Sequence, residues 1–133
     1  MGLAPIPASL CKHKVTFKVY APTSDVQKRY QEFGYQPLPE MENVHVQLHT
    51  TILKGLDNTE VQLKGTIFID PIRTEGANYL PRMQRQSLQN GKPMRVMISA
   101  PGDIAVGDYE VLEIDALPDV PSDRIHHYEI LLV

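Results

Sequence analysis

Apolar and polar residues alternate along several short segments of this chain, a pattern with the two-residue period of β-strands. The clearest example is the segment 44–53 (VHVQLHTTIL), in which one face is apolar and the other carries His, Gln and Thr side chains. The segments that predict strands are 15–20, 44–53, 61–69, 94–99, 104–114 and 125–133. We expect the following side chains to face the core: Val44, Val46, Leu48, Ile52, Val61, Leu63, Ile67, Ile69, Tyr109, Val111, Tyr128, Ile130 and Leu132.

The final segment, residues 125–133 (IHHYEILLV), carries apolar or aromatic side chains on both faces of its predicted strand. The end of a chain is usually polar and frayed unless it is tied down. A segment that stays apolar up to Val133 is therefore expected to be held inside a sheet.

The connections between the predicted strands are rich in proline and glycine. They comprise an extended N-terminal arm over residues 1–14 and two long loops over residues 21–43 and 71–93. Within the second loop, residues 80–89 can form one or two helical turns because Pro81 lies near the first helical position. The whole pattern predicts a mainly β protein, a single domain over residues 1–133 built as a small antiparallel β-barrel or sandwich of five to seven strands.

A tight turn is predicted at Gly107 and Asp108, which would make residues 104–114 a hairpin. Gly65 falls on the inward side of its strand, where a bulge or a close approach of the backbone is expected.

Composition narrows the class of protein. The chain has 133 residues, of which 42% are apolar and 22% are charged, as is typical of one globular domain. Its net charge of −3 disfavours a general nucleic-acid-binding protein, because such proteins carry a basic surface. Cys11 is the only cysteine, so neither an intrachain disulfide nor a cysteine zinc site can form. No segment approaches the roughly 20 apolar residues of a membrane span, and we expect a soluble protein made in the cytoplasm.

Histidine and carboxylate pairs are the residues to consider for catalysis or metal binding. His126 and His127 are adjacent in a predicted strand, so we expect their side chains to leave opposite faces. His45 and His49 share a face but lie roughly 13 Å apart along a strand, too far for two ligands of one zinc ion. The sequence contains no GxGxxG, P-loop or GxSxG pattern. We therefore predict no catalytic residue, no metal site and no cofactor, and a protein that is not an enzyme.

Aromatic and basic residues gather in the two long loops. Protein interfaces favour such side chains, and so do proteins that bind single-stranded nucleic acid. The alternative is that the loops only cover the ends of the barrel. We favour an interface, because loops above twenty residues are uncommon in a compact domain without a role. The predicted interface residues are Tyr30, Phe33, Tyr35, Tyr79, Arg82 and Arg85.

Several segments resemble the small minor capsid proteins of tailed phages that infect Gram-positive bacteria, a group similar to the head-closure (stopper-like) proteins of the phage neck. The terminal IHHYEILLV after GDIAVGDYEVLEI is similar to the end of these proteins, and PIPASLCKHKVTFKVY is similar to their start. ENVHVQL and EVQLKGTIFID resemble their second and third strands. The similarity covers most of the chain and is strongest over residues 44–70 and 103–133.

The resemblance implies a β-barrel that assembles as a homo-oligomeric ring, a hexamer in the particle, at the head–tail interface of the virion. Such a ring would contact the portal or adaptor protein on one side and the tail-terminator protein on the other. It would close the filled head and let double-stranded DNA pass without specific binding, which a slightly acidic subunit suits. We expect the loop 71–93 to narrow the channel, and deletion of residues 76–90 to leave a folded barrel.

Three other functions are compatible with the same pattern. One is another ring of the neck, such as a tail-terminator or an adaptor. The second is a stand-alone binding module with an OB-like or SH3-like barrel. The third is an enzyme on a small barrel, which would need a converging polar pocket that the predicted strand registers do not contain.

Overall fold

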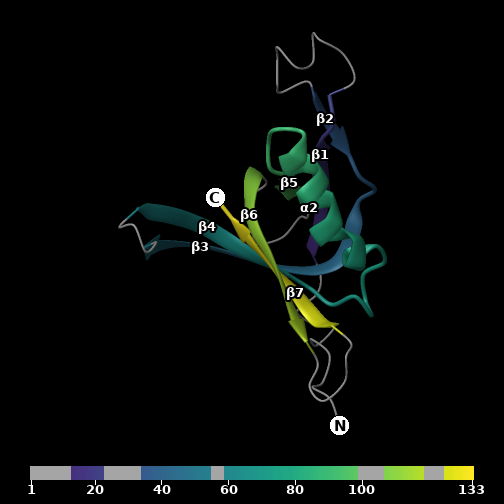
Figure 1. Ribbon diagram of the computed structural model, residues 1–133. Helices are drawn as coiled ribbons and strands as arrows, with labels where there is room; N and C mark the ends of the chain where they lie inside the picture. Colours follow the sequence, from purple (N-terminus) through teal and green to yellow (C-terminus); the bar gives the residue numbers. More distant parts are fainter. Residues whose placement is uncertain (1–12, 23–33, 55–58, 99–106, 119–124) are drawn as a thin grey trace.

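The computed structural model describes residues 13–22, 34–54, 59–98, 107–118 and 125–133 (Figure 1). These residues form a closed six-stranded antiparallel β-barrel with one additional strand and one short α-helix, which confirms the predicted mainly β fold. The strands are β1 (His13–Tyr20), β2 (Tyr35–Pro37), β3 (Met41–Lys54), β4 (Glu60–Ile69), β5 (Arg95–Ile98), β6 (Gly107–Pro118) and β7 (Ile125–Leu132). The helical elements are the 3-10 helix η3 (Ala77–Tyr79) and α2 (Leu80–Gln89).

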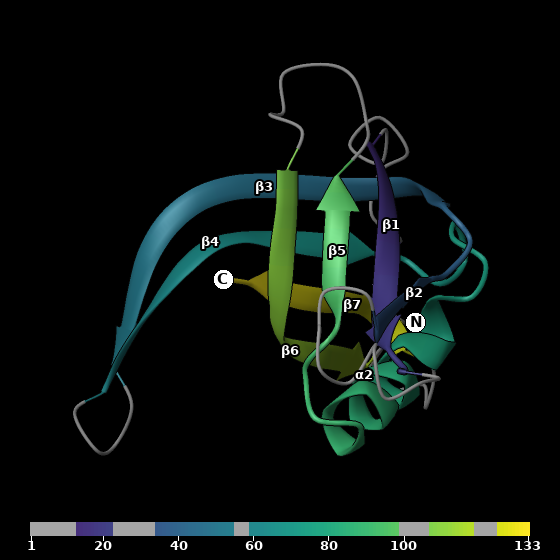
Figure 2. The same cartoon turned by 90° about the horizontal axis from the view of Figure 1, so that it is seen from above.

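The order of strands around the barrel is β1-β3-β4-β7-β6-β5, and β5 pairs again with β1. The short strand β2 extends the sheet by pairing with the end of β1. The long strands β3 and β6 each pair with different neighbours along their length, so they form the corners at which the sheet folds over (Figure 2). In β6 the corner coincides with a register shift between Val111 and Glu113, where a bulge bends the strand.

The interior of the barrel is filled by the alternate apolar side chains that the sequence pattern indicates. The fully buried members of this core include Val15, Phe17, Val44, Ile67, Ile69, Leu80, Met94, Val96, Ile98, Val111, Ile130 and Leu132. Val46, Leu63 and Tyr128 are also buried, Leu48 and Tyr109 pack against the cluster at its edge, and Val61 is half-buried. The terminal strand β7 lies between β4 and β6, which explains why it is apolar to its end.

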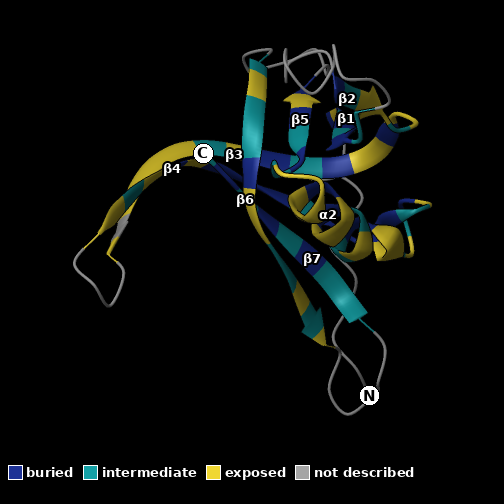
Figure 3. Ribbon diagram, turned by 45° about the horizontal axis from the view of Figure 1, so that its top comes forward, coloured by how far each residue is buried: buried dark blue, intermediate teal, exposed yellow. Residues whose placement is uncertain are grey.

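Ile52 does not face the core, contrary to the expectation from the alternation, and its side chain is 60% exposed. The reason is that β3 and β4 continue past the barrel as a two-stranded ribbon, residues 47–54 paired with residues 60–66 (Figure 2). Figure 3 shows the change from buried to exposed residues along this ribbon. An alternating strand therefore has a buried face only as far as the barrel reaches.

Gly65 lies where the ribbon leaves the barrel, opposite Leu48 and next to a register shift between Leu48 and Thr51. A Cβ atom at Gly65 would lie 2.7 Å from the backbone oxygen of Gln47. Glycine is therefore required here by the close approach of the two strands, as its inward position predicts.

The predicted turn at Gly107 and Asp108 is wrong. Both residues belong to β6 and pair with Ile98 and Met97 of β5. Residues 104–106 lie outside the described part of the chain. A Gly-Asp pair is a strong turn signal only when the flanking segments pair with each other, and here the partner strand is β5.

Residues 71–93 are an ordered connection that contains α2, with Pro81 at its first turn as predicted. The helix lies against the end of the barrel where β1 stops and β5 starts (Figure 1). Leu80 is fully buried in the core. Deleting residues 76–90 would remove Leu80 from the core, which argues against the expectation that the deletion leaves the barrel folded.

Polar side chains, in addition to the buried Leu80, fasten α2 to the barrel. The buried amide of Gln84 accepts a hydrogen bond from the Met94 N–H at 2.8 Å and donates one to the Val111 carbonyl at 3.1 Å. It therefore bridges β6 and the residue before β5 much as a peptide group of a neighbouring strand would.

Ser87 and Asn90 likewise bind backbone groups of the barrel, at the end of β1. The Ser87 hydroxyl, fully buried, accepts from the Tyr20 N–H at 2.9 Å and donates to the Lys92 carbonyl at 2.6 Å. The Asn90 side chain donates to the Tyr20 carbonyl at 2.9 Å. Both backbone groups of Tyr20 are thus satisfied by the helix where strand pairing ends.

We predict that Gln84→Leu lowers the free energy of unfolding by about 2–4 kcal/mol, because it leaves two buried backbone groups without these partners. The matched control is Gln86→Leu, since Gln86 is exposed on the same helix and the change there should stay within about 0.5 kcal/mol. Urea unfolding of both variants measures the difference. Equal loss in the two variants would show that the bridge does not stabilise the fold.

Candidate functional site

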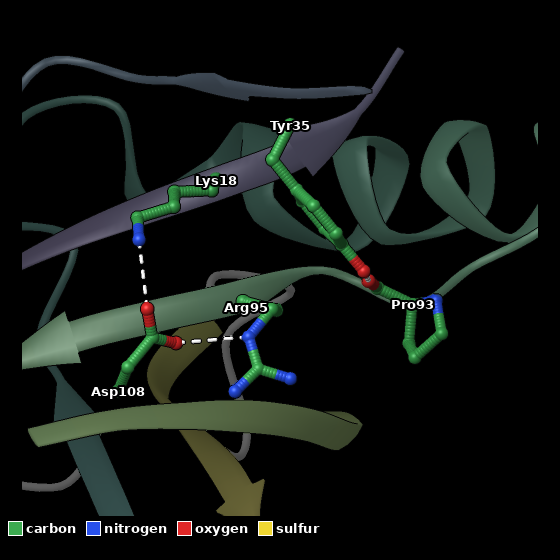
Figure 4. Close-up of polar contacts among 5 residues, drawn as sticks. All are labelled: Lys18, Tyr35, Pro93, Arg95 and Asp108. Atoms are coloured by element: carbon green, nitrogen blue, oxygen red, sulfur yellow. Dashed lines mark hydrogen bonds and ion pairs between the residues drawn. The ribbon is translucent and has the colours of Figure 1, made fainter. Parts of the chain in front are cut away.

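A polar cluster lies on the outer surface of the barrel where β1, β5 and β6 are neighbours (Figure 4). The Asp108 carboxylate lies between two cations: its Oδ2 is 2.7 Å from Lys18 Nζ and its Oδ1 is 2.9 Å from Arg95 Nε. These three side chains are separated by up to 90 positions in the sequence and meet because β5 pairs with both β1 and β6. No local motif in the sequence predicts this meeting.

Tyr35 of β2 borders the same cluster (Figure 4). Its hydroxyl donates to the Pro93 carbonyl at 2.9 Å, and its ring packs on Tyr20 with centroids 5.2 Å apart. Burial raises the pKa of the Tyr35 hydroxyl, and the nearby Arg95 only partly opposes this. Tyr35 therefore acts as a neutral hydrogen-bond donor that holds β2 against the residues before β5.

This cluster is a surface network of two cations around one carboxylate. The two ion pairs are partly exposed, with side-chain exposures of 26–39%, so each contributes at most about 1 kcal/mol to stability. A hollow of about 310 Å³ beside them is lined by Lys18, Tyr35, Pro37, Arg95 and Asp108. Its cations are already neutralised in part by Asp108, which makes it a weak anion site.

Three histidines and Phe68 form a row of rings across four strands. His13, His45, Phe68 and His127 follow one another from β1 to β7, with ring centroids 5.7, 5.8 and 6.2 Å apart. The His13 Nδ1 atom accepts a hydrogen bond from the Val46 N–H at 3.1 Å. These contacts give the rings a structural role in joining strands.

His126 and His127 do not leave opposite faces of β7, contrary to expectation. Their Nδ1 atoms lie 2.7 Å apart, and His127 Nε2 lies 3.2 Å from Glu129 Oε1. The register between β6 and β7 shifts between Leu117 and Pro118, which leaves His126 as an extra residue in a bulge. A bulge brings successive side chains to one side of a strand. No group of three or more metal-ligating side chains occurs within the residues that the structure describes.

A pair of carboxylates follows the bulge in β6. The Asp115 carboxylate raises the pKa of Glu113 above its ordinary value, with burial adding to the effect. Glu113 is exposed, and Asp115 is half-buried. The pair lies on the surface, where a repulsive contact between like charges costs little.

The predicted interface residues that the structure describes lie beside two different hollows or on α2. Tyr30 and Phe33 lie outside the described residues. Tyr35 belongs to the polar cluster, whereas Tyr79, 61% exposed, lies at the start of α2 beside an apolar groove. Arg82 and Arg85 are exposed on α2.

Leu38, Met41 and Met83 line the groove with Tyr79, and no sequence pattern predicts this. In the sequence these three residues are apolar but lie in segments without regular alternation, so nothing marks them as neighbours. None of the described helices is long and apolar enough to cross a membrane.

No known protein family, no curated protein and no solved structure matches this chain. Its function is therefore inferred from its fold and its surfaces.

We predict that Glu113 titrates above its ordinary range and that Asp115→Asn returns its pKa toward the ordinary value. A carboxyl whose pKa is raised by folding favours the folded state below its unfolded pKa, and this contribution is lost as the pH rises through the folded pKa. Asp115→Asn should therefore increase stability slightly at neutral pH and not at pH 3. NMR titration of the Glu113 carboxyl carbon tests this. An unchanged Glu113 pKa in the variant would contradict the assigned cause.

Proposed function

We propose that this chain is a structural subunit of the neck of a tailed bacteriophage, and not an enzyme. In this proposal it forms a ring between the portal or adaptor protein and the tail-terminator protein. The ring closes the DNA-filled head and supplies the surface to which the tail attaches. The segments in which the resemblance to minor capsid proteins is strongest contain β3, β4, β6 and β7, which are consecutive around the barrel.

The observation that supports a ring subunit most strongly is the ribbon that projects from the barrel (Figure 2). Over residues 47–54 β3 pairs only with β4, and over residues 60–64 β4 pairs only with β3, among the strands that the structure describes. Each copy therefore presents two unpaired strand edges on one arm. Natural proteins rarely leave long edges of this kind uncovered, because unpaired N–H and C=O groups invite pairing with another chain.

The two edges differ, since one belongs to β3 and the other to β4. Pairing of the β3 edge of one copy with the β4 edge of the next is a head-to-tail contact, and such contacts close into rings when the rotation allows it. The exposed Ile52 lies on this arm and would gain burial from the contact. A homo-oligomeric ring with six copies is the assembly that the resemblance implies.

The charge of the chain suits a channel through which DNA passes. A net charge of −3 per subunit is multiplied by the number of copies in a ring. An acidic ring would make few contacts with the phosphate backbone. This suits a channel, because every such contact would have to be broken as the DNA moves.

We expect that disrupting the gene for this chain in its phage produces DNA-filled or leaking heads without tails, together with free tails. Electron microscopy of the lysate tests this, and supplying the chain in trans should restore infectious particles. Normal tailed particles without the chain would refute the neck assignment. Binding of short DNA that weakens steeply with salt would instead favour a stand-alone nucleic-acid-binding module.

Shortening the ribbon separates assembly from folding. Replacing residues 51–62 with Asn-Gly, which favours a tight hairpin turn, keeps Leu63 and the register in which Leu48 faces Gly65. The replaced residues that the structure describes are mostly exposed. We expect unchanged folding, measured by circular dichroism, but no complementation of the gene disruption. The matched control is Thr50→Ser on the intact ribbon, which should complement fully. Full complementation by the shortened chain would exclude the ribbon as the contact between copies.

A further inference from the structure

An apolar groove of about 490 Å³ lies between the start of α2 and the segment that leads from β2 into β3. The buried side chains of Met41 and Leu80 contribute to its lining, and the partly buried Leu38 and Met83 extend the apolar surface. Tyr79 borders it and is 61% exposed. A rigid exposed aromatic ring beside adaptable methionines is the composition of a protein-binding surface.

A second, polar hollow of about 340 Å³ adjoins the groove and shares Glu40, Met41 and Glu75 with it. Its shape is set by hydrogen bonds between its walls. The Thr74 hydroxyl donates to the Glu42 carbonyl at 3.0 Å, and the Asn43 side chain donates to the Arg73 carbonyl at 3.4 Å. The two hollows therefore form one elongated site with an apolar part and a polar part.

The charges of this site are mainly negative. Glu40 and Glu75 stand where the two hollows join, and Glu42 lines the polar one. The only cation among its described lining residues is Arg73, and Lys14 reaches Glu42 from outside at 3.5 Å. The described lining of the apolar groove itself contains carboxylates and no basic side chain. A ligand that fits both parts must therefore be apolar at one end and cationic at the other.

We propose that the two hollows are a docking site for an extended peptide segment of a partner protein. A bulky apolar side chain of the segment enters the groove beside Tyr79 and Met83. A Lys or Arg close to it in the segment enters the acidic hollow and pairs with Glu75. This site does not involve the ribbon and stands independently of the proposed ring.

The test uses the full chain and a synthetic acetylated and amidated peptide, GSFSKRSG, titrated by NMR. We expect saturable shifts of the backbone amide signals of Glu75, Tyr79 and Met83. Binding should weaken at least about tenfold in the variants Glu75→Lys and Tyr79→Ser, and with added salt. Both positions are exposed, so the fold should persist, which the spectra of the variants will show directly.

Matched controls separate the two halves of the site. The peptides GSSSKRSG and GSFSEESG should each bind at least about tenfold more weakly than GSFSKRSG. The variants Leu88→Ser and Glu60→Lys, at the far end of α2 and on the ribbon, should bind GSFSKRSG as the original chain does. No saturable shift at the groove, or equal binding by Glu75→Lys, would overturn the proposal.

A second copy is the other occupant that the test distinguishes. If the amide signals of Tyr79 and Met83 move with protein concentration in the absence of peptide, the groove is a contact between copies. That result would also overturn the peptide proposal. The Tyr79→Ser variant leaves the ribbon unchanged. Its ability to complement the gene disruption therefore tests the groove and not the ribbon.

Discussion

The barrel depends on β1 pairing along both of its edges. Residues 15–18 pair with residues 95–98 of β5, while the start of β1 pairs with β3 and its end with β2. Without the β1–β5 pairing the six strands would form an open sheet with two unpaired edges. Closure also encloses Val15 and Phe17 of β1 together with Val96 and Ile98 of β5, all fully buried. Strand β1 therefore both completes the backbone hydrogen bonding of the barrel and helps to bury its core.

Closure leaves backbone groups to be satisfied where strand pairing stops, and α2 provides the partners. Gln84 bridges Met94 and Val111, and Ser87 and Asn90 bind the two backbone groups of Tyr20. An amide or hydroxyl side chain replaces a missing neighbouring strand, which explains why a helix packs with buried polar residues. The same bonds fix α2 in place, and so position the groove that its first turn forms with the segment before β3.

One strand connects the two surfaces to which we assign functions. Met41, at the start of the fourteen-residue strand β3, lies in the floor of the apolar groove, while residues 47–54 of the same strand form one side of the ribbon. Between them Val44 and Val46 are buried in the barrel. A partner at the groove and a neighbouring copy at the ribbon would thus both be held by a strand that is anchored in the core.

Alternation of apolar residues determined most of the strands, because a strand with one buried face must repeat every two residues. It also determined the buried character of Ile67, Ile130 and Leu132. Pro81 independently indicated the start of α2. Alternation could not show where β3 leaves the barrel, and so placed Ile52 inside. The meeting of Lys18, Arg95 and Asp108, the bulge at His126 and the groove beside Tyr79 arose only in the tertiary structure. The first two depend on the register between paired strands, and the groove depends on how α2 packs beside the segment before β3. Neither leaves a local pattern in the sequence.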